Sequence, residues 1–87
     1  MRYELAMSRF YFHLREGDKL ITDDEGLDLP DLAAARREAE QAARELLAEA
    51  IKGKNEKVSE AIVIADEEGQ PLFTLLLSAV LPKTLKK

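Results

Sequence analysis

The sequence predicts an α+β domain in which one antiparallel-rich sheet carries a single long helix on one of its faces. Two observations predict this fold: an amphipathic helical segment in the middle of the chain, and a pair of β-rich runs on each side of it. The expected element order is ββαββ. A chain of 87 residues has room for one small domain, which we place at residues 8–78. Residues 1–7 are expected to form an N-terminal extension and residues 79–87 a frayed tail.

The first predicted hairpin lies ahead of the helix. Residues 8–14 alternate and are rich in aromatic side chains, which is typical of a strand. Gly17 and Asp18 supply a turn, and residues 19–22 return as a short second strand. The polar segment 23–26 then ends in a glycine, which favours another turn.

The strongest predicted element is a helix from Asp31 to Lys52. Asp31 is the expected N-cap because its carboxylate can accept hydrogen bonds from the free amides of the first turn, and Asp28 is the alternative cap. Pro30 disfavours an earlier start, and Gly53 is a natural stop. Apolar residues recur every three or four positions and predict one buried stripe, formed by Leu32, Ala35, Ala39, Ala42, Ala43, Leu46, Leu47, Ala50 and Ile51. The opposite side carries the polar residues Arg36, Arg37, Glu40, Gln41, Arg44, Glu45 and Glu49.

Two β-rich runs after the helix predict a second hairpin. The strands are expected at residues 58–66 and 70–78, with an acidic turn at residues 66–69 between them. Pro71 stands at the start of the last strand, where a missing amide is tolerated.

Both strands of this second hairpin are apolar on both faces, because neither run alternates with polar residues. One helix can cover only one face of a sheet. The face expected beneath the helix comprises Phe10, Phe12, Leu14, Ile62, Ile64, Phe73, Leu75 and Leu77. The opposite face is the candidate interaction face and comprises Tyr11, His13, Ala61, Val63, Ala65, Leu72, Thr74 and Leu76.

A large exposed apolar face is rare on a monomer. We therefore expect a homodimer that forms through this face or through an edge strand. The alternative is that one of the chain's own ends folds back over the face. A small protein partner is a further expectation.

Composition and charge argue against several classes of protein. The chain has no cysteine, which excludes disulfide scaffolds, zinc–cysteine sites and thiol nucleophiles. A net charge of −4 makes nucleic acid an unexpected partner, and no apolar run approaches the roughly 20 residues of a membrane span. The first residues do not resemble a signal peptide, so the cytoplasm is the expected location. We expect no cofactor.

No combination of residues predicts catalysis or metal binding. His13 is the only histidine, and catalysis or zinc binding would need partners that the sequence does not supply, so a structural or interface role is expected. No serine lies in a nucleophile elbow, and the acidic segment at residues 23–25 lacks the alternate spacing of a calcium loop. The prediction is a non-catalytic interaction or regulatory module. A small enzyme or metal binder that uses His13 and nearby carboxylates is an alternative.

Four motifs occur in a fixed order along the chain: Arg9-Phe10-Tyr11-Phe12-His13, then Gly17-Asp18 with Asp23-Asp24-Glu25-Gly26, then Leu29-Pro30-Asp31-Leu32, then an acidic hairpin from Asp66 to Thr74. With this set, over about residues 7–78, the chain resembles a family of small uncharacterised bacterial proteins that share a domain of unknown function. The resemblance implies that Met7 is the usual start and that residues 1–6 are an extension. It implies no activity.

The chain is also similar, more distantly, to HicB-type antitoxin domains. These domains place strands, an Asp-rich turn and Pro-Asp-Leu before an Ala/Glu-rich helix, as residues 30–32 and their surroundings do here. The likeness implies an antitoxin-like protein that neutralises a small partner ribonuclease, although the DNA-binding appendage of that family is missing from this sequence.

Overall fold

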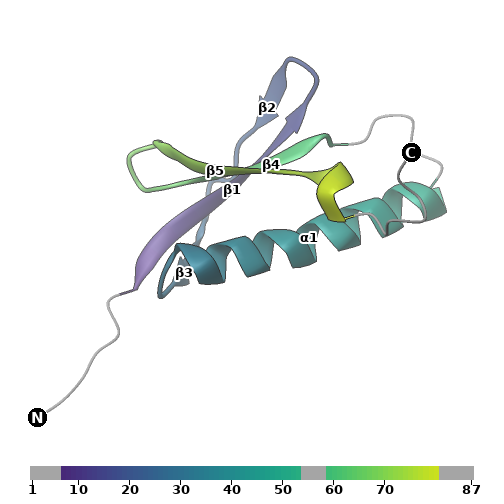
Figure 1. The fold of residues 1–87 in the computed structure, drawn as a ribbon. Coiled ribbons are helices and arrows are strands. Elements are labelled where there is room, and N and C mark those ends of the chain that lie inside the picture. The colour runs from purple at the N-terminus through teal and green to yellow at the C-terminus, as the bar shows by residue number, and fades with distance from the viewer. Residues whose placement is uncertain (1–6, 54–58, 81–87) are drawn as a thin grey trace, which may run out of the picture.

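One long helix lies along one face of a five-stranded antiparallel sheet in the computed structural model of the chain, which describes residues 7–53 and 59–80 (Figure 1). The elements in chain order are β1 (Ser8–Glu16), β2 (Lys19–Ile21), β3 (Leu27–Leu29), α1 (Leu32–Gly53), β4 (Ala61–Ala65), β5 (Pro71–Leu76) and the 3-10 helix η1 (Leu77–Val80). The predicted α+β class is confirmed. Three strands, not two, precede the helix.

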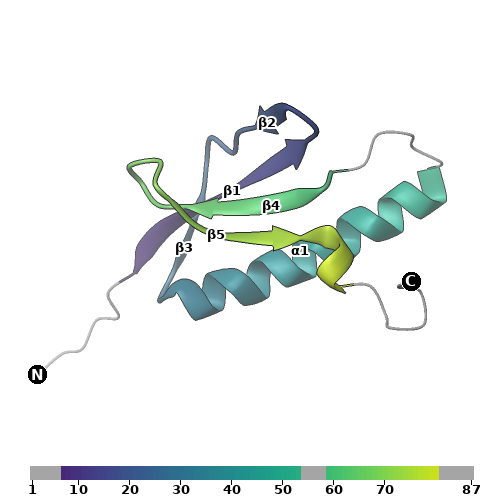
Figure 2. The ribbon, with the colours of Figure 1, turned by 45° about the horizontal axis from the view of Figure 1, so that its top comes forward.

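Strand β1 is the long strand around which the sheet is built. The strand order is β2-β1-β4-β5, and β3 also pairs with β1. Residues 14–16 of β1 pair with β2 and residues 8–10 pair with β3, so the two short strands share one edge of β1. Strand β5 forms the other edge of the sheet, as Figure 2 shows.

The third strand corrects the sequence-based prediction, which treated Leu27–Leu29 as a lead into the helix. Three residues are too few to show the period of two that identifies a strand. The segment becomes a strand because β1 extends past β2 and offers a second place to pair, with Ser8 opposite Leu29 and Phe10 opposite Leu27.

The helix begins where the sequence predicts. The backbone N–H of Ala34 donates to Oδ1 of Asp31 at 2.8 Å, which confirms Asp31 as the N-cap. One residue differs from the predicted pattern: Ile51, expected in the buried stripe, is 75% exposed. Arg36 is exposed as predicted, and it also places its guanidinium carbon 4.2 Å from the ring centre of Phe73.

The core lies between α1 and the sheet. Three alanines, Ala35, Ala39 and Ala43, are fully buried, and their small side chains let the helix backbone approach the strands closely. The face predicted beneath the helix is confirmed. Five of its residues are buried: Phe10, Ile62, Ile64, Leu75 and Leu77. The other three are partly buried: Phe12, Leu14 and Phe73.

The last strand ends earlier than predicted. The chain leaves β5 at Leu76 and turns into η1, where Leu77 is buried and Val80 packs against the core. Ala79 is therefore part of a helical turn and not of a frayed tail. Strand β4 likewise starts at Ala61, with Ser59 and Glu60 outside it. Val80, also predicted as tail, belongs to η1, whereas residues 81–87, the N-terminal residues 1–6 and Val58 lie outside the described residues.

Candidate functional site

The face of the sheet opposite α1, called the open face below, contains seven of the eight residues predicted for interaction. Strand pairing sets them in rows, because alternate residues of a strand share a face. Tyr11 stands opposite Ala65 and His13 opposite Val63. On the other side of β4, Thr74 stands opposite Val63 and Leu76 opposite Ala61. The rings of Tyr11 and His13 are stacked with their centres 6.4 Å apart.

The eighth residue, Leu72, stands at a register shift. Ile64 pairs with Phe73 and Ala65 pairs with Pro71, so Leu72 has no residue opposite it on β4. Simple alternation, on which its prediction rested, therefore does not assign Leu72 to a face. Its side chain is 39% exposed.

The centre of the open face is already buried within one chain, which corrects the prediction of a broad exposed apolar surface. Ala61, Val63 and Ala65 are 1%, 6% and 1% exposed. The apolar side chains that remain accessible lie on the outer strands: Leu76 on β5 is 56% exposed, and Leu20 on β2 is 48% exposed. Sequence analysis missed Leu20, whose position on this face follows from its pairing with Arg15.

His13 is tied to the backbone of the segment that joins β2 to β3. The backbone N–H of Asp23 donates to Nδ1 of His13 at 3.0 Å. A ring nitrogen that accepts a hydrogen bond carries no proton, so the neutral ring holds its proton on Nε2. The single imidazole of the chain therefore has a structural task.

The carboxylate of Asp23 completes this connection. Its Oδ2 accepts the N–H of Phe12 at 3.1 Å, and its Oδ1 accepts the N–H groups of Glu25 and Gly26 at 3.1 and 3.2 Å. Phe12 lies between the part of β1 that pairs with β3 and the part that pairs with β2. The side chain of Asp23 thus accepts the N–H of Phe12, which neither β2 nor β3 is placed to pair with at this edge of β1.

The hydrogen bonds to Asp23 also set its ionisation. Burial raises the pKa of Asp23, but the hydrogen bonds from the backbone N–H groups of Phe12, Gly26 and Glu25 lower it more. The net result is a pKa for Asp23 below its ordinary value of 3.8. The sequence-based interpretation of residues 23–26 as a polar turn therefore misses the role of Asp23, which could have been recognised only from the gap in the pairing of β1.

Gly26 lets the same segment pass close to β1. Its φ is +72°, and an added Cβ would lie 2.8 Å from Cγ of Arg9 and 2.9 Å from Cε2 of Tyr11. Arg9 fastens the segment from outside, donating to the carbonyl oxygen of Glu25 at 2.6 Å and pairing with both carboxylate oxygens of Asp28.

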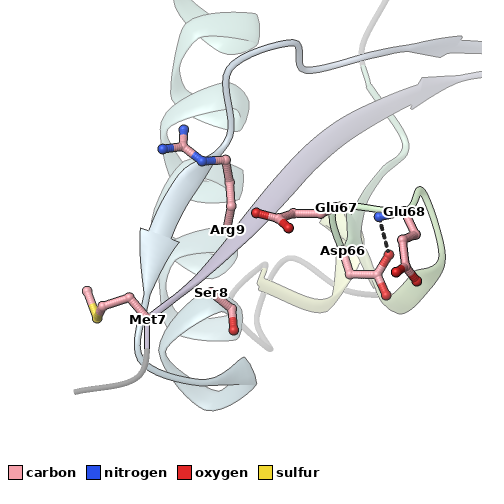
Figure 3. Close-up of a pocket in the computed structure, with 6 residues that line it drawn as sticks. All are labelled: Met7, Ser8, Arg9, Asp66, Glu67 and Glu68. Atoms are coloured by element: carbon pink, nitrogen blue, oxygen red, sulfur yellow. Dashed lines mark hydrogen bonds between the residues drawn. The ribbon is translucent and has the colours of Figure 1, made fainter. Parts of the chain in front are cut away.

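An open pocket of about 250 Å³ lies beside this region and is lined by Met7, Ser8, Arg9, Asp66, Glu67 and Glu68 (Figure 3). Oδ1 of Asp66 accepts the N–H groups of Glu68 and Gln70, both at 2.9 Å, and so organises the turn between β4 and β5. Within residues 7–53 and 59–80, no three His, Cys, Asp or Glu side chains are grouped to hold a metal ion.

A family model matches residues 9–78, which include every residue of the predicted interaction face, and its description is the domain of unknown function DUF6894. The chain belongs to this family. The match confirms the resemblance to a domain of unknown function. No curated protein and no solved structure matches the chain. In the described part of this DUF6894 chain, no helix is long and apolar enough to cross a membrane.

Proposed function

We propose that this DUF6894 protein is a non-catalytic interaction module that associates with a second copy of itself. The observation that carries the proposal is the exposure of Leu76, which is 56% accessible on a strand at the edge of the sheet. Complete burial of a fully exposed leucine side chain is favourable by about 1.5–3 kcal/mol, and roughly half of that remains to be gained at Leu76. A second copy supplies the same exposed residue, so a two-fold contact buries both at once.

The state of the imidazole supports a role without catalysis. A neutral imidazole can act as a general base only through the ring nitrogen that carries no proton. Nδ1 of His13 instead accepts the N–H of Asp23, and the carboxylate of Asp23 accepts three backbone N–H groups. The His13–carboxylate pair considered for an enzyme or metal site therefore maintains the fold.

Sedimentation velocity over a range of concentrations, with the variant Leu76→Glu, tests the proposal. The wild-type chain is expected to shift from monomer to dimer as concentration rises. Leu76→Glu places a charge at the contact and should weaken the dimer at least tenfold, which corresponds to about 1.4 kcal/mol. Because Leu76 is exposed in the single chain, the variant should keep the wild-type circular dichroism spectrum.

Ile51→Glu is the matched control. Ile51 is 75% exposed near the end of α1, so it tests whether any exposed apolar residue produces the effect. This variant should dimerise like the wild type. A wild-type chain that stays monomeric at every concentration contradicts self-association and leaves a different small protein as the partner to be sought.

A further inference from the structure

The two edges of the sheet differ in how they are protected against pairing. Natural edge strands are commonly short or carry charged residues, which discourages the addition of another strand. Strand β2 has three residues and includes Lys19. Strand β5 (Pro71–Leu76) and η1 contain no charged residue. The edge protections that β5 does have, Pro71 and the register shift at Leu72, lie at its first two positions, so residues 73–76 have neither. Among the described strands, only β4 pairs with β5, so no described strand occupies the outer edge of β5.

Two observations show which amides of β5 face outward. The N–H of Leu77 donates to the carbonyl oxygen of Glu60, so the odd-numbered residues of β5 direct their backbone groups toward β4. Strand β1 lies on the other side of β4, and the N–H of Phe12 in β1 points away from β4, toward Asp23. Because the backbone groups of successive strand residues alternate in direction, those of the next residue, His13, bond to β4. Val63 then bonds to His13, and its other neighbour Thr74 directs its N–H and C=O to the free edge.

We infer that β5 pairs antiparallel with β5 of a second copy, about a two-fold axis at Thr74. The inference rests on the proposed self-association and specifies its geometry. In this register Thr74 exchanges both backbone hydrogen bonds with Thr74 of the second copy. Leu72 stands opposite Leu76 of the second copy, and Phe73 opposite Leu75. The outward backbone groups of Thr74 find partners in the second copy, and Leu76, which is 56% exposed in one chain, lies at the contact.

The charges near β5 favour the antiparallel arrangement over a parallel one. The turn before β5 carries the exposed residues Glu67 and Glu68. Parallel pairing would set the two acidic turns side by side, where like charges repel. Antiparallel pairing sends them to opposite ends of the joined strands and brings each toward the uncharged η1 of the other copy.

The variant Thr74→Pro tests the direction of the amides. Proline is tolerated on an edge strand where the lost N–H faces outward, but it removes the two central hydrogen bonds of the joined strands. We expect a folded monomer whose dimer dissociation constant is raised at least tenfold. A Thr74→Pro variant that folds and dimerises like the wild type overturns the inference.

Cross-linking tests the register in a way that does not depend on the folding of the proline variant. The chain has no cysteine, so Thr74→Cys introduces a single thiol. Opposed Cβ atoms in an antiparallel pair lie about 4.5–5.5 Å apart, within reach of a short bismaleimide. The matched control is Thr22→Cys, an exposed position directly after β2 at the other edge of the sheet.

Three outcomes are distinguishable. Cross-linked dimer from Thr74→Cys but not from Thr22→Cys supports the β5 pairing. A dimer by sedimentation that cross-links only through Thr22→Cys, or through neither position, overturns the pairing and leaves self-association intact. A chain that is monomeric by sedimentation overturns both the pairing and the proposed function.

Discussion

Asp23 shows how one side chain can replace part of a strand. Its two carboxylate oxygens accept three backbone N–H groups, from Phe12, Glu25 and Gly26. Asp66 begins a similar acidic turn, but its carboxylate accepts N–H groups only from its own turn, at Glu68 and Gln70. Asp23 therefore joins a turn to a neighbouring strand, whereas Asp66 shapes a turn alone.

The stability of the fold should depend on the charge of Asp23. Its pKa is lower in the folded chain than the unfolded value of about 3.9, so ionised Asp23 stabilises the fold at pH values above about 4, and this contribution is lost as the pH falls through the lowered pKa. Asp23→Asn leaves at least one backbone N–H facing an amide NH₂ group. We expect a loss of roughly 1–3 kcal/mol at neutral pH, measured by urea unfolding.

The pH dependence of the unfolding free energy separates the effect of the Asp23 charge from the effect of its side-chain shape. The difference in unfolding free energy between the wild type and Asp23→Asn should shrink as the pH falls below about 4, where Asp23 itself becomes neutral. Asp24→Asn removes the same charge from the next, exposed residue and should change stability by less than about 0.5 kcal/mol. Equal losses in the two variants would contradict a special role for Asp23.

At the scale of elements, the sequence predicts well those segments whose pattern of apolar residues repeats over several turns or several strand residues. The helix over Leu32–Gly53 and its Asp31 cap follow from periodicity and local hydrogen bonding. Strand β3 and the register shift at Leu72 do not, because both depend on which residues of another strand lie opposite. The same limit applies to the open face: alternation identifies seven of the eight predicted residues, but it shows neither the position of Leu72 nor the burial of Val63.

The close contact between α1 and the sheet should tolerate little added volume. Ala39 is 0% exposed at the middle of the buried row of alanines. Ala39→Leu must push the helix away from the strands or strain its own rotamer, which costs roughly 1–3 kcal/mol of unfolding free energy. Ala48→Leu makes the same change at an exposed position of the helix and should cost less than about 0.5 kcal/mol. Urea unfolding followed by circular dichroism at one fixed concentration measures both.

At the scale of the whole molecule, the two faces of the sheet are covered differently. The helix fills one face of the sheet, while the open face has a buried centre and exposed apolar residues toward its edges. One edge is split between β2 and β3, and the other is the uncharged β5. A second copy at β5 would extend the sheet across the pair and leave both helices on the same side of it.

If dimerisation and folding are coupled in this way, the melting temperature should rise with protein concentration. For a dimer that unfolds to two separate chains, a hundredfold rise in concentration adds about 2.7 kcal/mol per dimer, or roughly 1.4 kcal/mol per chain. A domain of this size changes its melting temperature by about 4–8 °C per kcal/mol, so the expected rise is roughly 5–10 °C. Scanning calorimetry at the two concentrations measures it. Thr74→Pro, whose dimer is expected to be at least tenfold weaker, should show a smaller rise in melting temperature between the two concentrations. A wild-type chain that melts at the same temperature at both concentrations would contradict a dimer stabilised through β5.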